Sequence, residues 1–155
     1  MSAAPKVITL AAAGAIALAA TLVAPWEGLR TIPYKDLVGV TTICFGSTRY
    51  VEAREYTVAE CKDLLQSDLT THWVGVEKCI KRPLKENEAA AILSWTFNVG
   101  VGAACKSTLI RKVNEGRPTS EWCRELFRWN KAGGKVVRGL TNRRKAEFRT
   151  CIGVH

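Results

Sequence analysis

Apolar residues recur at helical spacing along the middle of the chain. From residue 61 to residue 76 they fall mostly three or four positions apart, at Cys61, Leu64, Leu65, Leu69, Trp73 and Val76. This period places them on one face of a helix. Thr57, followed three residues later by Glu60, is a capping box, so we expect the helix to begin just after Thr57. The pattern predicts a long amphipathic helix whose apolar stripe belongs to the core.

Further helices are predicted downstream. Residues 86–99 are apolar on nearly every side, which is typical of a buried central helix. Ser107 is expected to cap a short helix over residues 108–114. Residues 118–120 precede another helix, and a last one runs through Ile152. The apolar members of the helix after residue 120 are Trp122, Cys123, Leu126, Phe127 and Trp129.

The stretch from Tyr34 to Phe45 has a different pattern. It is rich in β-branched and aromatic residues, and Gly39 lies near its middle. These features predict a short hairpin or two irregular strands. Pro33 prevents a helix from leading into it. The chain is therefore expected to be α+β and mainly α.

Two carboxylates frame the start of this β-like region. Glu27 and Asp36 are nine positions apart, and a helix would turn them to opposite faces, through about 900°. They can face each other only across a bend. Glycoside hydrolysis uses such a pair, one carboxyl protonated in a drier place and the other ionised. Trp26 and Leu29 are expected to provide the drier setting for Glu27, and Lys35 and Thr42 to keep Asp36 in polar surroundings.

These residues resemble the catalytic signature of the phage-type lysozymes. The matching features are Glu-Gly-Leu-Arg from residue 27, Tyr-Lys-Asp ending at residue 36, and Thr-Ile-x-x-Gly from residue 42. Phage-type lysozymes are muramidases that cut the β-1,4 bond between N-acetylmuramic acid and N-acetylglucosamine in peptidoglycan. The resemblance implies Glu27 as the general acid, Asp36 as the carboxylate that places the attacking water, and Thr42 as its assistant.

The resemblance covers residues 26–152 and extends to the fold and to the cleft. It implies a two-lobed lysozyme-like fold with a small β-hairpin lobe, a long connecting helix and a helical C-terminal lobe, and we expect a monomeric catalytic domain over residues 26–155. It also implies that Asn98 borders the cleft, that Trp129 packs near the catalytic Glu, and that Arg143 pairs with it. For Asn98, a cap at the helix C-terminus stays an open alternative. Ser47 departs from the family, which usually has His at this position, and this puts the local hydrogen bonding in question.

An uncharged segment precedes the motif. Residues 7–24 contain 18 uncharged residues, eight of them Ala, and as a helix they would measure about 27 Å, at the lower limit for a bilayer core. One interpretation is a signal-arrest-release segment, which exports the chain, holds it in the membrane and leaves without cleavage. The others are a signal peptide cleaved at Ala17-Leu18-Ala19, and a fixed anchor or core helix. We favour release and assign residues 1–25 to the membrane segment.

The closeness of this segment to Glu27 suggests regulation. While residues 7–24 lie in the host inner membrane, Glu27 is held at the bilayer surface and cannot share a cleft with Asp36. Our hypothesis is that the membrane-bound form is inactive. Release into the periplasm then activates the enzyme and leads to host lysis.

The chain is basic, with 23 Lys and Arg against 14 Asp and Glu and a formal net charge of +9. Such a surface favours polyanions. Arg144, Lys145 and Arg149 are expected to form a solvated basic face. Export and the lack of a recognition motif argue against a nucleic acid, so anionic peptidoglycan is the expected partner.

Six cysteines lie beyond the export segment, and export favours disulfides. Fifteen pairings are open, and we expect the set in chain order: Cys44 with Cys61, Cys79 with Cys105, and Cys123 with Cys151. Buried free thiols are the alternative. The chain has no Cys-x-x-Cys motif, and its histidines, His72 and His155, are far apart, so neither a metal site nor a cofactor is expected.

Two other functions stay open. A lytic transglycosylase cleaves the same bond with one acid and leaves a 1,6-anhydro sugar, a route that needs no positioned water and so does not explain Asp36 with Thr42. A non-catalytic cationic protein that binds the wall or the membrane would act without Glu27.

Overall fold

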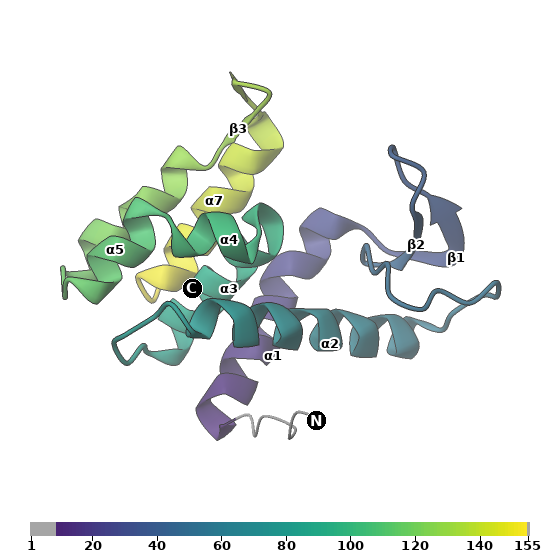
Figure 1. Cartoon of the computed structure of the whole chain (residues 1–155), viewed down its shortest axis with the longest axis horizontal. Coiled ribbons are helices and arrows are strands. Elements are labelled where there is room, and N and C mark those ends of the chain that lie inside the picture. Colours follow the sequence, from purple (N-terminus) through teal and green to yellow (C-terminus); the bar gives the residue numbers. More distant parts are fainter. Residues whose placement is uncertain (1–8, 155) are drawn as a thin grey trace.

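The computed structural model describes residues 9–154 and is mainly helical, as predicted (Figure 1). Two small antiparallel hairpins accompany the helices. The elements, in order, are α1 (Leu10–Glu27), β1 (Arg30–Lys35), β2 (Thr41–Cys44), α2 (Val58–Glu77), α3 (Glu86–Val99), α4 (Val101–Cys105), α5 (Thr108–Asn114), α6 (Thr119–Arg124), the 3-10 helix η1 (Glu125–Arg128), β3 (Lys131–Ala132), β4 (Lys135–Val136) and α7 (Arg138–Cys151).

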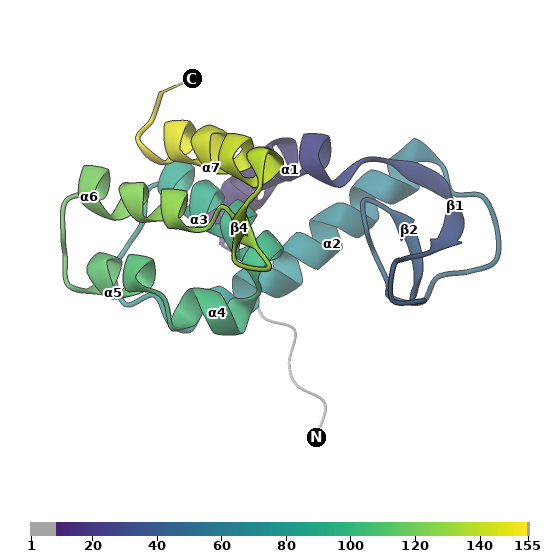
Figure 2. The same cartoon turned by 90° about the horizontal axis from the view of Figure 1, so that it is seen from above.

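The molecule has two lobes joined by α2. Figure 2 shows the β1–β2 hairpin at one end, the shorter helices around α3 at the other, and α2 running between them. This arrangement confirms the predicted small hairpin lobe, long connecting helix and helical C-terminal lobe.

The hairpin begins earlier than predicted, at Arg30 rather than after Pro33. Arg30 is opposite Cys44 and Tyr34 is opposite Thr42, with an irregular register between them. Pro33 lies in that irregular part, where its missing N–H breaks no regular ladder. The proline therefore interrupts the strand without ending it.

The predicted start and buried face of α2 are confirmed. The Glu60 backbone N–H donates to Thr57 Oγ1 at 3.1 Å, and the Thr57 N–H donates to Glu60 Oε2 at 3.2 Å. This reciprocal cap satisfies two N–H groups of the first turn. Leu64 is only half-buried. The buried residues of the stripe are Cys61, Leu65, Leu69, Trp73 and Val76.

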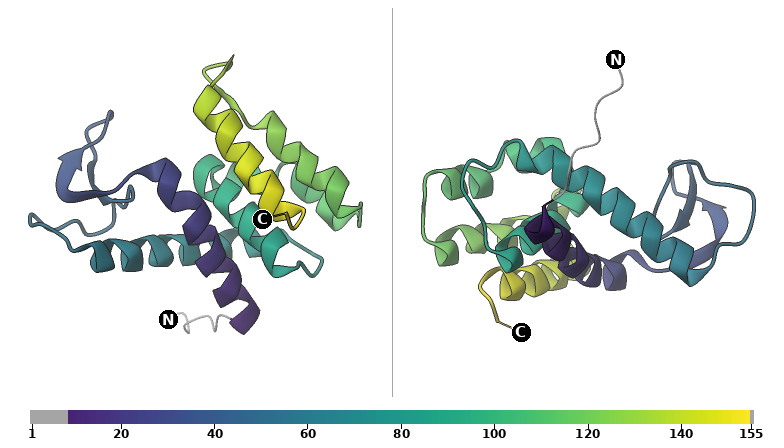
Figure 3. Two further views of the ribbon diagram at one scale, coloured as in Figure 1. Left: turned by 180° about the vertical axis from the view of Figure 1, so that it is seen from behind. Right: turned by 90° about the horizontal axis from the view of Figure 1, so that it is seen from below.

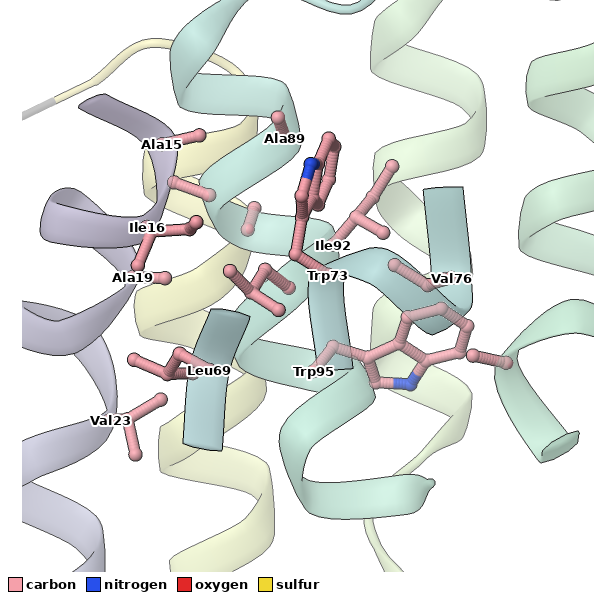
Figure 4. Close-up of a cluster of buried hydrophobic side chains, with 14 of the residues drawn as sticks. Ala15, Ile16, Ala19, Val23, Leu69, Trp73, Val76, Ala89, Ile92 and Trp95 are labelled. Atoms are coloured by element: carbon pink, nitrogen blue, oxygen red, sulfur yellow. The ribbon is translucent and has the colours of Figure 1, made fainter. Parts of the chain in front are cut away.

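The core is built around α3. All residues from Glu88 to Thr96 are buried, so neighbours cover this helix on every side. Helix α1 packs against it through small side chains, and Figure 4 shows Ala15, Ile16 and Ala19 gathered beside α3. Small residues on both helices allow their backbones to approach closely. Figure 3 shows from behind how α1 crosses the molecule.

The proposed membrane segment is therefore a core helix in this structure. Residues 7 and 8 lie outside the described residues, and residues 10–24 belong to α1, which continues through Pro25 to Glu27. One helix thus spans the domain boundary expected at residue 25. Among residues 9–154, no helix is both long and apolar enough to cross a membrane.

Three disulfides tie the elements together, in the predicted chain order. Cys44–Cys61 joins the hairpin to α2. Cys79–Cys105 joins the loop after α2 to α4, and Cys123–Cys151 joins α6 to α7.

The shorter helices match the predictions only in part. Helix α4 was not predicted, and α6 ends at Arg124, so Leu126 and Phe127 lie in η1 and Trp129 lies outside both helices. Ser107 caps α5, since its hydroxyl accepts from the Ile110 N–H at 3.1 Å. Helix α6 begins at Thr119, inside the segment that was expected to precede it, with Pro118 at the N-cap. Proline suits this position because it lacks the N–H that a helix start leaves unpaired.

Candidate active site

Glu27 is the last residue of α1, and its side chain lies where the two lobes meet. Gly28 follows with φ of 69°, a backbone conformation that glycine adopts readily, and leads the chain into β1. The Arg143 guanidinium of α7 donates to Glu27 Oε1 at 2.8 Å. The Arg143 side chain is 5% exposed and that of Glu27 is 26% exposed. The carboxylate is thus held by a buried cation on one side and open to solvent on the other.

Arg143 belongs to a buried network of alternating charges. Arg143 Nε lies 3.7 Å from Glu147 Oε2, and Arg144 Nε lies 2.6 Å from Glu147 Oε1. Ser94 of α3 donates its hydroxyl to Glu147 at 2.6 Å. The prediction of a surface position for Arg144 is wrong, because its side chain is fully buried against Glu147. Lys145 and Arg149 are exposed, as predicted.

Glu147 is the centre of this network. Burial raises the pKa of the Glu147 carboxyl above its usual value, and the two arginines and the Ser94 hydroxyl act in the opposite direction. The carboxylate links α7 to α3 through Ser94. It therefore helps to fix the helix that presents Arg143 to Glu27.

Asp36 lies at the turn of the hairpin. Its Oδ1 accepts the backbone N–H groups of Val38 and Val40, at 2.9 Å and 2.8 Å. The Thr42 side chain is buried, and its hydroxyl donates to the Val40 carbonyl at 2.9 Å. The turn therefore fixes both side chains, and it leaves Oδ2 of Asp36 outside these hydrogen bonds.

A cavity of about 360 Å³ opens beside Glu27, between the hairpin lobe and helices α2 and α3. Neither Asp36 nor Thr42 is among its lining residues, so Glu27 is the only one of the three predicted catalytic residues that lines it. The lining residues are Glu27, Phe45, Gly46, Thr48, Arg49, Asp68, His72, Phe97 and Asn98.

Of the two residues predicted near the cleft, Asn98 lines the cavity and Trp129 does not. Asn98 is exposed and lines the cavity, whereas the end of α3 is closed by the Gly100 N–H, which donates to the Thr96 carbonyl at 2.8 Å. The structure thus places Asn98 at the cavity and not at the helix cap. Trp129 packs edge-on against Trp95, with ring centroids 5.3 Å apart, and does not line the cavity.

Ser47 is buried directly after the glycine that borders the cavity. Its backbone exchanges two hydrogen bonds of 2.9 Å with Ile43. Its hydroxyl is buried without a hydrogen-bond partner among residues 9–154. The local backbone therefore holds without the side chain that the family usually has here.

The sequence prediction missed the residues that α2 contributes to the cavity. Asp68 and His72 are four positions apart, so they share one face of the helix. Each directly precedes a member of the apolar stripe, Leu69 or Trp73. Two polar residues in this register, beside a buried stripe, were the available signal.

The described residues contain no group of three or more His, Cys, Asp or Glu side chains that could hold a metal ion. A carboxyl held by a guanidinium at the edge of an open cavity can exchange a proton with a bound ligand.

Comparisons with known proteins agree with this architecture. The family model described as phage lysozyme matches residues 24–147. A SAR-endolysin of Bacteriophage PS119 is 40% identical over 155 residues, which cover 95% of this chain and 92% of that relative.

Two solved structures share the fold. The endolysin from Escherichia coli O157:H7 phage FAHEc1 has a TM-score of 0.75 at 28% identity, covering 96% of both chains. A mutant of P22 lysozyme has a TM-score of 0.79 at 27% identity, covering 87% of this chain and 95% of that one. The chain therefore belongs to the phage lysozyme family, has its lysozyme-like fold, and is a glycoside hydrolase of the muramidase type.

Proposed function

We propose that the chain is a phage endolysin that hydrolyses the β-1,4 bond between N-acetylmuramic acid and N-acetylglucosamine in peptidoglycan. The observation that carries the proposal is Glu27 at the edge of the cavity, with its carboxylate held by the buried Arg143 at 2.8 Å. In this assignment Glu27 is the general acid, which gives its proton to the oxygen of the glycosidic bond.

Arg143 and Asp36 have complementary parts in this scheme. The Arg143 guanidinium orients the Glu27 carboxyl and stabilises the carboxylate left after proton transfer. Asp36, with Oδ1 fixed by two backbone N–H groups, uses Oδ2 to orient a water molecule. That water attacks the anomeric carbon and loses a proton to Asp36, and Thr42 keeps the turn in place.

The test is mass spectrometry of the soluble fragments that the full chain releases from purified peptidoglycan. We expect reducing N-acetylmuramic acid ends. Glu27→Gln should lower the rate about 10²–10⁴-fold, the usual contribution of a general acid, and Asp36→Asn should also lower it. Asp63→Asn is the matched control, because Asp63 is exposed on α2.

Other fragment patterns would contradict the proposal. Anhydro ends would identify a lytic transglycosylase. Lysis of cells without any released fragment, unaffected by Glu27→Gln, would support the non-catalytic cationic protein.

We also propose that the chain is exported to the periplasm and held inactive in the host inner membrane by residues 7–24 until release. The relative from Bacteriophage PS119 is a SAR-endolysin, and this chain has an uncharged, Ala-rich segment at residues 7–24. The docked α1 supports the second half of the scheme. Its position in the core is the arrangement that a released segment would reach, with Glu27 at its end.

The composition of α1 fits both environments. Its buried face includes Ala15, Ile16, Ala19 and Val23, which gain from burial against α3. Its outer face has Ala11, Ala13 and Ala17, which add little to membrane affinity. Because the segment is only weakly hydrophobic, transfer from lipid to the protein core has a small cost.

The outer face allows a test that leaves the core packing intact. Replacing Ala11, Ala13 and Ala17 together by Leu makes the segment more hydrophobic, since each Leu favours membrane insertion, without adding atoms to the buried face. We expect the variant to stay in the membrane fraction and lysis to be delayed. The triple replacement by Ser is the control and should be released normally. Equal release of both variants would contradict the proposal.

A further inference from the structure

Helix α2 forms one wall of the cavity beside Glu27, through Asp68 and His72. The two residues are one helical turn apart and half-buried. Phe97 of α3 packs against the His72 ring, with centroids 4.9 Å apart. This contact and the helix hold the imidazole in a defined orientation, so the wall is a prearranged surface.

The hydrogen bond of His72 decides which of its ring nitrogens carries the proton. Nδ1 lies 2.7 Å from the backbone carbonyl oxygen of Asp68. A carbonyl oxygen can only accept a hydrogen bond, so Nδ1 must donate. In the neutral ring Nε2 is then an acceptor, because only one nitrogen carries a hydrogen.

The Asp68 carboxylate is a second acceptor on the same wall. Among residues 9–154, no ion pair and no side-chain hydrogen bond involves its oxygens. The cation in the same cavity is Arg49, whose Nη1 donates to Thr71 Oγ1 at 3.3 Å. Arg49 is thus held on α2 and does not neutralise Asp68 by direct contact.

The Asp68 carboxylate and Nε2 of the neutral His72 ring are thus two hydrogen-bond acceptors on one wall, and a ligand that fits them must supply hydrogen-bond donors. We infer that Asp68 and His72 bind the hydroxyl and acetamido N–H groups of one sugar of the glycan, and that they determine how tightly it is held. Phe45 and Phe97 line the same cavity and offer an apolar surface to the C–H face of the sugar ring. This inference rests on the proposed function, and it names residues for the substrate that function requires.

The test uses the full chain and glycan strands from which the stem peptides have been removed. Asp68→Asn replaces one carboxylate oxygen by a donor group, and His72→Phe keeps the ring but removes both nitrogens. For each variant we expect KM to rise about tenfold, the effect of losing one good hydrogen bond to the ligand, while kcat changes less than twofold. Asp63→Asn, on the exposed face of α2, should leave both constants unchanged.

A binding measurement separates this inference from the proposed function. Calorimetry with the tetrasaccharide of N-acetylglucosamine needs no cleavage, and we expect about tenfold weaker binding for Asp68→Asn. If the wild-type chain cleaves nothing but binds the tetrasaccharide about tenfold more tightly than Asp68→Asn, the sugar site on α2 is supported and the proposed hydrolysis is refuted. If it cleaves the strands and both variants keep the wild-type KM and affinity, the wall is not a sugar site.

A third outcome would also overturn the inference. If the variants lose activity only on strands that carry stem peptides, the wall recognises the peptide and not the sugar. Asp68→Asn suffices for this decision, because its half-exposed side chain can change without disturbing the core. Its thermal unfolding midpoint should match that of the wild-type chain.

Discussion

Replacing Glu147 by Gln tests the buried charge network that supports the site. The Glu147 side chain is completely buried and contacts Arg143 and Arg144. In the wild-type chain, these two arginines are balanced by Glu147 and Glu27. The substitution keeps the shape and the partner for the Ser94 hydroxyl, but it leaves one positive charge without a counter-charge.

The expected loss in the free energy of unfolding follows from the burial of the network. Breaking a buried ion pair by removing one partner typically costs about 3–5 kcal/mol, because the remaining charge stays buried. In a chain of this size, 1 kcal/mol corresponds to a shift of about 2–4 °C in the unfolding midpoint. We therefore expect a decrease of roughly 6–20 °C, with the disulfides intact.

The assay is thermal unfolding followed by circular dichroism under non-reducing conditions. Glu115→Gln is the matched control, because Glu115 forms an exposed ion pair with Arg111 at 3.4 Å, and such pairs contribute at most about 1 kcal/mol. A loss of stability below about 1 kcal/mol for Glu147→Gln would show that the charges of this network are better solvated than their burial in the structure indicates.

Two further pairs of substitutions test the packing of the helices. Ala19 is fully buried on α1, so Ala19→Leu should destabilise by about 1–3 kcal/mol through overpacking, whereas Ala17→Leu on the exposed face should be nearly neutral; equal midpoints in urea unfolding would contradict the docking of α1. A Cβ at Gly75 would lie 2.9 Å from the Val101 side chain, whereas one at Gly102 would meet nothing within 4 Å. Gly102→Ala should thus stabilise by about 0.5–1 kcal/mol and Gly75→Ala should not, a contrast that denaturant midpoints will check.

The helical part of the fold could be predicted because its signals are local. The capping box at Thr57 and the apolar period after it determine where α2 begins and which face it buries. The apolar residues of 86–99 predict α3 with the observed bounds. Such patterns lie within a few turns of one helix, so they can be recognised without knowing which segments pack against it.

The environment of α1 could not be decided from the sequence. A run of Ala with a few Ile, Leu and Val suits a lipid bilayer and also a core made of small residues. What distinguishes the two is the partner surface, and here α3 supplies it from more than 50 positions downstream. Burial between distant segments has no local signature.

The site was predictable only in part for the same reason. Glu27 and Arg143 were indicated by motifs, and their pairing needs α1 and α7 to meet, which only the fold provides. Arg144 was assigned to the surface because a cluster of basic residues is typical of a surface. Its buried partner Glu147 belongs to no recognisable motif, so the sequence gives no sign of their pairing. Asp68 and His72 carry no motif, and their role depends on which side of α2 faces the cavity.

In the proposed scheme, Glu27 enters its site only when α1 lies in the core. The most direct measurement compares the activity per mole of the membrane-held and the released full chain on the same purified peptidoglycan. Without docked α1 the proposed general acid would be absent from the site, so the membrane-held form should be at least about 100-fold less active. Equal activity of the two forms would show that the membrane segment does not hold the enzyme inactive.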